Sequence, residues 1–385
     1  MRELNIIVSE DKVMSDIRKK GITLLSSHRS FIMGIAILWV AWFHTDLEIG
    51  IPGIAFFREI GYGGVDLFFL LTGIGAYFSL KKNPDTVSYM KNRFFRILPS
   101  YYPFILVWLV MMMITGEVYG TEIIGNLTMM GWWCGGRNQF NWYTNAIWLF
   151  YLLAPFLVGI IGREDEGTVR PVNKSAVFGK SVNRKVVITV SLMAAGFLAS
   201  MTFWHTLLLT AFSRLPLFIL GIYLGSEIME EKRSGVSGKY PLVFWNVLMA
   251  AGFGLLYFCL MKLSGSMWNY GLWWYPFILI APGLSLDLAC LAEMISKFRI
   301  GRCIKNAVSQ IGNASFEIFL WHIGVFEFVK PRYEMNGLKW AVLLTVVVLW
   351  SIGYRKGIEC IVKKLKKIFS KNLKVNQKSS DIYYK

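Results

Sequence analysis

The sequence predicts an all-α protein, a polytopic transmembrane helical bundle of about ten spans. Hydrophobic residues make up 55% of the 385 residues, charged residues make up only 17%, and the mean hydropathy is +0.47. Apolar runs of roughly 17 to 25 residues recur along the whole chain, and a helix needs runs of that length to cross about 30 Å of hydrocarbon. The expected solvent is therefore the lipid bilayer.

Ten apolar runs are expected to be spans. They cover residues 31–48, 62–80, 100–116, 141–161, 186–203, 206–226, 242–262, 270–291, 308–329 and 338–354. The run 121–134 is apolar but short, so it is expected to be an interfacial or re-entrant piece. The transmembrane domain is thus expected over residues 31–354, between a basic N-terminal segment (1–30) and a Lys-rich tail (355–385).

The distribution of Lys and Arg predicts which way the chain lies in the membrane, because cytoplasmic loops carry the excess of positive charge. Of the 41 Lys and Arg residues, 34 lie in alternate segments that include both chain ends, six lie in the opposite segments, and Arg214 lies within a span. Both termini are therefore expected in the cytoplasm, with the protein in the plasma or inner membrane. The first thirty residues contain no apolar stretch closed by a cleavage site, so no signal peptide is expected.

The composition also argues against two other kinds of protein. The net charge is +17, but the basic residues punctuate apolar runs, whereas a nucleic-acid-binding protein gathers them on a soluble face. The five cysteines lack C-x-x-C spacing, which argues against a disulfide framework and a zinc site. No nucleic acid and no metal are therefore expected. The cysteines are Cys134, Cys259, Cys290, Cys303 and Cys360.

Four ionisable residues are expected inside spans, where each one costs at least a few kcal/mol and needs a partner or a task. His44 lies about thirteen residues into the first span and Asp66 about four residues into the second, which enters from the opposite side, so both fall in the outer half at nearly the same depth. His322 in the ninth expected span and Arg214 in the sixth fall near that level. The sequence thus predicts one buried polar layer. For each residue alone, a position at the membrane interface is the alternative.

A second polar cluster is expected on the cytoplasmic side. The segment KNRFFRILPSYY places Arg93 and Arg96 on one helical face, just ahead of Pro99, which is expected to open the next span. Two guanidinium groups beside a helix N-terminus favour a phosphate group. Ordinary positive charge flanking a span is the alternative interpretation.

Taken together, these segments resemble acyltransferase family 3, the multipass membrane enzymes that move acetyl and related groups onto hydroxyls of surface polysaccharides and other acceptors. The likeness extends over about residues 28–352, and its specific parts are GIAILWVAWFH, GYGGVDLFFLLTG, RFFRILPSYY, SRLPLFILG and ASFEIFLWH, in that order. The resemblance implies that His44 is catalytic and that Arg93 and Arg96 bind the acyl-CoA donor. The chain departs from the family pattern at Thr72, where Ser is usual, and after His322, where Trp-Pro is common.

The expected reaction is transfer of an acyl group, most simply acetyl from acetyl-CoA, from cytoplasmic acyl-CoA to a hydroxyl of a surface polysaccharide or another glycan or lipid-linked acceptor. His44 is the expected general base, and Asp66 is expected to hold its tautomer. A covalent acyl-histidine is an alternative route. Residues considered for oxyanion stabilisation or support are Arg214, His322, Trp148 and Asn145.

Other functions also fit part of the pattern. A polysaccharide or lipid-linked sugar transporter or flippase without catalysis is one, because ten spans with buried polar residues suit transport. The sequence shows no inverted repeat, which argues against it. The other large group of membrane-bound O-acyltransferases also uses a buried histidine, but lacks this one on the first span and the R-x-x-R-x-x-P arrangement. A non-catalytic membrane sensor is a further alternative.

Overall fold

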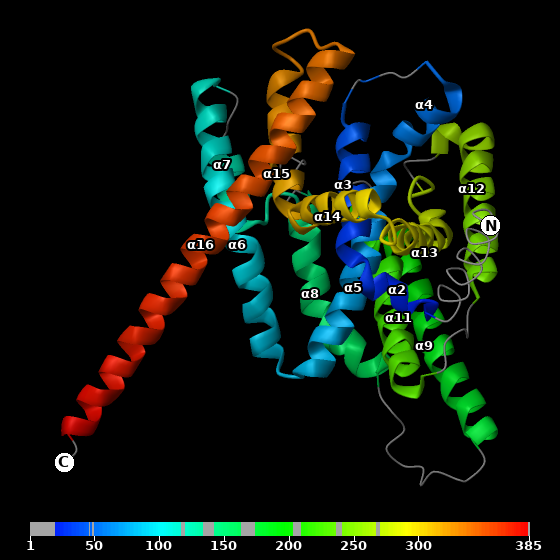
Figure 1. The fold of residues 1–385 in the computed structure, drawn as a ribbon. Coiled ribbons are helices and arrows are strands. Elements are labelled where there is room, and N and C mark those ends of the chain that lie inside the picture. The colour runs from blue at the N-terminus through cyan, green and yellow to red at the C-terminus, as the bar shows by residue number, and fades with distance from the viewer. Residues whose placement is uncertain are drawn as a thin grey trace.

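The computed structural model describes residues 20–45, 47, 50–116, 120–133, 142–162, 174–202, 209–235, 241–266 and 270–383, and over these residues the chain is almost entirely helical, with no strand (Figure 1). The predicted all-α class is confirmed. The helices are α2 (Thr23–Ser27), α3 (Arg29–Phe43), α4 (Pro52–Glu59), η1 (Gly61–Gly63), α5 (Gly64–Lys82), α6 (Thr86–Ile114), α7 (Gly120–Thr128), α8 (Trp142–Ile161), α9 (Lys174–Thr202), α10 (Leu209–Phe212), α11 (Leu215–Ser234), α12 (Leu242–Lys262), η3 (Ser264–Ser266), α13 (Phe277–Ile295), α14 (Arg299–Asn313), α15 (Ser315–Val329) and α16 (Gly337–Tyr383).

Seven helices of the described chain are long and apolar enough to cross a membrane, which confirms a polytopic bundle. They are α5, α6, α8, α11, α12, α13 and the first part of α16. The helices α3 and α15 are also apolar and lie at predicted spans, but each has only 15 residues. The total of ten spans stays a prediction.

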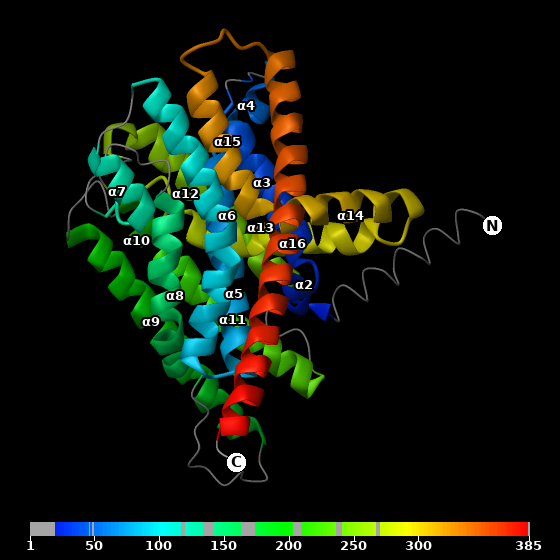
Figure 2. The same cartoon turned by 90° about the vertical axis from the view of Figure 1, so that its left-hand side faces the viewer.

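The prediction of one span over residues 308–329 is wrong, because the helix is interrupted at Ala314, where α14 ends and α15 begins. In both views α14 lies across the long axis of the bundle, whereas α15 runs along it (Figures 1 and 2). Val308 and Ile311 belong to the apolar face of α14. Because they precede the apolar helix α15 directly, the apolar run in the sequence seemed to begin before α15 does.

The expectation that Pro99 opens a helix is also wrong. Helix α6 begins at Thr86, and Asp85 caps it by accepting hydrogen bonds from the backbone N–H groups of Val87 (3.2 Å) and Ser88 (2.9 Å). Pro99 lies inside this helix. Arg93 and Arg96 therefore lie beyond the first turn of α6, so its N-terminal dipole does not contribute to their site.

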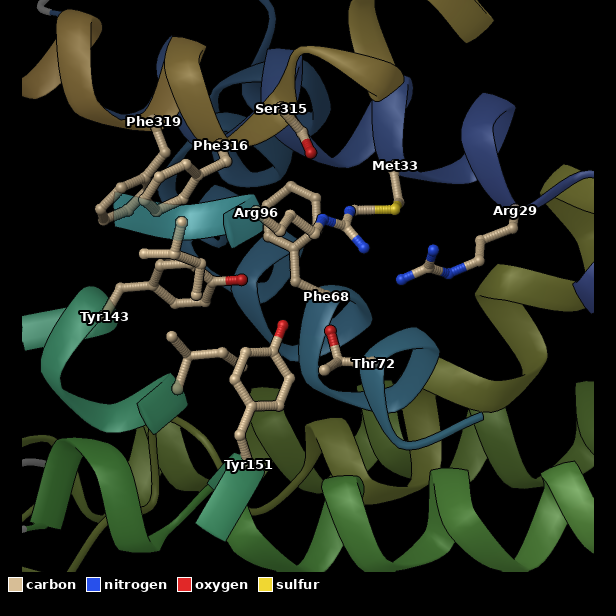
Figure 3. Close-up of a pocket in the computed structure, with 12 residues that line it drawn as sticks. Arg29, Met33, Phe68, Thr72, Arg96, Tyr143, Tyr151, Ser315, Phe316 and Phe319 are labelled. Carbon is tan, nitrogen blue, oxygen red and sulfur yellow. The ribbon is translucent and has the colours of Figure 1, made fainter. Parts of the chain in front are cut away.

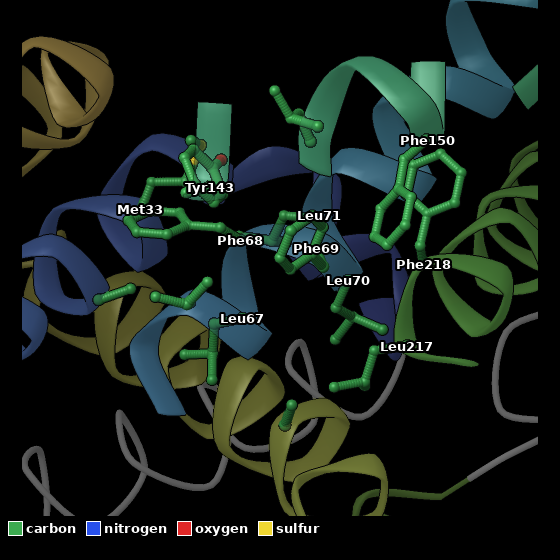
Figure 4. Close-up of a cluster of buried hydrophobic side chains, with 14 of the residues drawn as sticks. Met33, Leu67, Phe68, Phe69, Leu70, Leu71, Tyr143, Phe150, Leu217 and Phe218 are labelled. Carbon is green, nitrogen blue, oxygen red and sulfur yellow. The ribbon is translucent and has the colours of Figure 1, made fainter. Parts of the chain in front are cut away.

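Helices α5 and α11 form the centre of the bundle and pack backbone to backbone. A Cβ atom added at Gly73 would lie 2.2 Å from the Phe218 carbonyl oxygen, and one at Gly221 would lie 2.1 Å from the Leu70 carbonyl oxygen. Small residues at such a crossing allow close helix packing in a membrane. Figure 4 shows the large apolar side chains around this crossing, which come from α3, α5, α8 and α11. The contact fixes α11 against the helix that carries Asp66.

Candidate active site and arginine pocket

Two histidines from distant parts of the sequence lie beside each other. His44 follows the last residue of α3 and is half-buried, whereas His322 lies in α15 and is fully buried. Their ring centroids are 5.2 Å apart and the ring planes are inclined by 67°. The sequence placed these two residues at a similar depth in the membrane, and in the structure their rings are in direct contact.

Each histidine is oriented by its own helix. Nδ1 of His44 lies 2.8 Å from the Val40 carbonyl oxygen, and Nδ1 of His322 lies 2.7 Å from the Ile318 carbonyl oxygen. A carbonyl only accepts, so the Nδ1–H group is the donor and Nε2 of each neutral ring carries a lone pair. Nε2 of His322 is buried without a hydrogen-bond partner in the described structure. His44 therefore has the tautomer that a general base acting through Nε2 needs.

Asp66 pairs with Arg214, at the N-terminal ends of the two central helices. The Arg214 Nε atom lies 3.5 Å from Asp66 Oδ1, and the two side chains are 2% and 0% exposed. Arg214 also donates from Nη1 to the Thr210 carbonyl oxygen over 2.6 Å. Its guanidinium lies between the rings of Trp142 and Trp274, at 4.9 Å and 4.8 Å from their centroids. Arg214 is thus held on every side by ionic, hydrogen-bonded and cation–π contacts.

Asp66 was expected to hold the tautomer of His44, but in the described structure Asp66 accepts no hydrogen bond from His44. The Val40 carbonyl, not Asp66, holds the His44 tautomer. The single predicted polar layer is instead two pairs, His44 with His322 and Asp66 with Arg214. Depth along a span follows from sequence, but the rotation that turns Asp66 toward α11 depends on packing.

The other expected support residues have different neighbours. The Trp148 indole donates to Met129 Sδ over 3.0 Å, and its ring contacts Phe94 and Tyr151 rather than the histidines. An oxyanion role for Trp148 is therefore not supported. Asn145 is buried in α8, with 2% of its surface exposed.

A pocket opens beside the arginines that precede the apolar part of α6 (Figure 3). Arg29, the first residue of α3, and Arg96 direct their guanidinium groups into it, together with the hydroxyl groups of Tyr143, Tyr151 and Thr72. None of the described residues that line it is acidic, and the remaining ones are Met33, Phe68, Ile97, Ile147, Ser315, Phe316 and Phe319.

Arg93 lies next to this pocket. Its guanidinium packs over the rings of Tyr89 and Tyr151, at 4.8 Å and 5.2 Å from their centroids. Arg29 is half-buried, and its buried Nε atom has no hydrogen-bond partner in the described chain. Three like charges gathered around hydroxyl groups, with no carboxylate among the described lining residues, have the chemistry that suits an anion such as phosphate.

The sequence did not indicate that two basic residues, Arg29 and Lys330, belong near the candidate site. Arg29 was counted with the charges that flank the first span, although it begins α3, the helix that His44 follows. Lys330 was counted with the outer segments, but it follows α15, the helix that carries His322, and its ammonium lies 5.7 Å from the ring centroid of Trp340. Each residue lies at an end of a helix that places a histidine, and that position was the available signal.

The pocket and the histidine pair share a wall. Phe319 lines the pocket and contacts Tyr143, with ring centroids 4.8 Å apart. The same ring lies 5.7 Å from the His322 ring, one helical turn along α15. Only one aromatic side chain, Phe319, therefore separates the arginine pocket from His322 along α15.

No group of three or more His, Cys, Asp or Glu residues that could hold a metal ion occurs in the described part of the chain. Cys259, Cys290, Cys303 and Cys360 are free thiols, and Cys134 lies outside the described residues.

Comparison with known proteins bears on this arrangement. A family model described as an acyltransferase domain matches residues 32–354, which contain both histidines, the buried ion pair and the α6 arginines. No curated protein and no solved structure matches the chain. Because the match covers most of the sequence, the chain belongs to acyltransferase family 3 and is a membrane acyltransferase.

Proposed function

We propose that the chain transfers an acyl group, acetyl in the simplest case, from cytoplasmic acyl-CoA to a hydroxyl group of a surface polysaccharide or a lipid-linked glycan. The observation that carries the proposal is that a single side chain, Phe319, lies between the arginine pocket and the histidine pair and contacts both. A donor bound by its phosphates at the arginines would direct its acyl end toward His44.

The donor site consists of Arg29, Arg93 and Arg96. Guanidinium groups bind phosphate oxygens through paired N–H donors. The hydroxyl groups of Tyr143 and Tyr151 add neutral donors, and the apolar side chains of the lining suit the thioester arm of acyl-CoA. The excess of Lys and Arg at this end of the spans supports its cytoplasmic position, where acyl-CoA is made.

The two ends of α3 mark the distance to be bridged. Arg29 begins this helix and His44 follows its end, and a rise of 1.5 Å per residue separates them by about 22 Å. The donor arm therefore runs along α3 between Arg29 and the histidine pair. This sidedness makes the membrane part of the mechanism.

At the reacting centre, Nε2 of His44 takes the proton from the acceptor hydroxyl as its oxygen attacks the thioester carbonyl carbon. The tetrahedral intermediate collapses, the carbon–sulfur bond breaks, and the thiolate of CoA receives the proton from the imidazolium. General base catalysis of this kind contributes about 10² to 10⁴ in rate. The hydrogen bond to Val40 keeps Nε2 free for the transfer.

The negative charge that develops on the carbonyl oxygen needs a donor or a cation nearby. Arg214 is engaged by Asp66 and by two tryptophan rings, so we assign a structural role to the Asp66–Arg214 pair. The family assignment favours catalysis over transport without chemistry.

Mass spectrometry of surface glycans from cells that produce the wild-type protein or its His44→Ala variant tests the proposal. Wild-type cells are expected to carry a glycan heavier by one acyl group, and the variant is expected to lose that mass while its amount in the membrane is unchanged. Normal acylation by His44→Ala would disprove the role of His44, and an unchanged glycan in cells with and without the wild-type protein would disprove the acceptor class.

A further inference from the structure

Helix α14 and the residues just before it form a surface that the acyl-transfer chemistry does not use. The segment 297–305, named here the basic tip, contains Lys297, Arg299, Arg302 and Lys305 and no acidic residue. No ion pair in the described part of the chain holds any of these four residues. Figure 2 shows this end of α14 projecting sideways from the bundle.

The other end of α14 is fixed to α3. A Cβ atom added at Gly34 would lie 2.1 Å from the Val308 carbonyl oxygen, and one at Gly312 would lie 1.8 Å from the Ser30 carbonyl oxygen. Ser30 also donates to Asn313 Oδ1 over 2.8 Å. The backbone of α14 therefore rests against the first turns of α3, at the end that holds Arg29. By the distribution of Lys and Arg, this end faces the cytoplasm.

The basic tip exposes apolar as well as charged groups. Phe298, Ile300 and Ile304 are 69%, 77% and 52% exposed, and the two isoleucines lie one turn apart on one face of α14. Arg299 and Arg302 are exposed on the other face. Exposure of this much apolar surface to water is unfavourable, because each isoleucine side chain has a lower free energy when it is buried away from water.

We propose that the basic tip lies in the cytoplasmic leaflet of the membrane and binds the headgroups of anionic lipids. A helix that projects sideways from the bundle, with apolar residues on one face and Lys and Arg on the other, inserts its apolar face among acyl chains and directs its cations to phosphate groups. The absence of acidic residues in the tip makes it complementary to a negative surface. The proposal does not depend on the identity of the acyl donor or acceptor.

Hydrogen–deuterium exchange of the full-length protein in lipid nanodiscs tests this inference. Discs of phosphatidylcholine are compared with discs in which about a third of the lipid is phosphatidylglycerol. Each basic residue at an anionic surface contributes roughly fivefold in affinity, so amides 298–305 are expected to exchange about tenfold or more slowly in the anionic discs.

A triple variant and a matched control separate local binding from overall charge. Lys297→Gln, Arg299→Gln and Arg302→Gln together are expected to abolish the difference between the two discs. Lys82→Gln, Lys363→Gln and Lys364→Gln, which remove the same charge from other exposed positions, are expected to keep it. Equal exchange of the wild-type tip in both discs would overturn the proposal, as would loss of the difference in the control. The proposal would also be overturned if the tip were protected in phosphatidylcholine discs that hold two copies of the protein but not in discs that hold one. That result would show that the tip binds a second copy of the chain.

Discussion

Asp66 and Arg214 form a buried ion pair whose disruption has a calculable cost. At an effective dielectric constant of about 20, unit charges 3.5 Å apart attract each other by about 5 kcal/mol. Asp66→Asn keeps the shape of the side chain but leaves the Arg214 guanidinium, which is 1% exposed, without its counter-charge. Removing one partner of a buried pair costs about 3 to 5 kcal/mol, and we expect a loss in that range.

A double-mutant cycle in mixed micelles measures this coupling. The singles Asp66→Asn and Arg214→Met are each expected to lower the free energy of unfolding, and the double variant is expected to lose at least about 2 kcal/mol less than their sum. Additive losses would refute the pairing. Arg214→Met removes the cation–π contacts with Trp142 and Trp274 whether residue 66 is Asp or Asn, so their contribution cancels in the cycle.

The same Asp66→Asn variant distinguishes two functional roles. If Val40 holds the His44 tautomer, the folded fraction of this variant keeps its transfer rate within about tenfold of the wild type, since the base is intact. A fall of about 10⁴, the loss seen when the acid of a hydrolase triad is neutralised, would return Asp66 to the role that the sequence predicted.

Three further predictions follow from the site and the packing. Arg29→Gln is expected to weaken acyl-CoA binding about 10- to 100-fold, since one charge-assisted contact is lost, and equilibrium binding with Lys82→Gln as control checks it. Gly73→Ala is expected to destabilise the protein by about 1 to 3 kcal/mol, because the added Cβ would meet the α11 backbone. Gly254→Ala is the control, since open space surrounds Gly254, and it is not expected to destabilise the protein. Thermal unfolding compares the two variants. Burial lowers the pKa of His28 below 6.5, although Glu293 opposes the shift. The folded protein therefore binds this proton less readily than the unfolded chain, and its stability falls as the pH falls through 6.5. We expect the His28→Gln variant to lose less stability than the wild type between about pH 7.5 and 5.5.

The sequence predicted the helical bundle well because the requirements of a membrane are local. Apolar length and the placement of Lys and Arg depend on each segment alone, and a helix is present in the described structure at each predicted span. The error at residues 308–329 arose where two helices of different direction meet, since hydropathy averages over Ala314 without sensing the break. An amphipathic period would have separated α14 from the uniformly apolar α15.

The candidate site was predictable in depth but not in direction. His44 and His322 were placed at one level and do meet. Asp66 was placed at that level too, yet it turns toward Arg214, because the glycine contacts between α5 and α11 set the rotation of both helices. Arg29 joined the α6 arginines only through tertiary packing, and no spacing within the sequence indicates that contact.

The central claim is that donor binding and acyl transfer occupy opposite ends of α3. Parallel measurement of acetyl-CoA binding and of acyl transfer by purified protein in nanodiscs tests it most directly. We predict that His44→Ala binds acetyl-CoA with wild-type affinity but transfers nothing, and that Arg96→Gln binds it at least about tenfold more weakly. Transfer at the wild-type rate by His44→Ala, or unchanged binding by Arg96→Gln, would contradict the account.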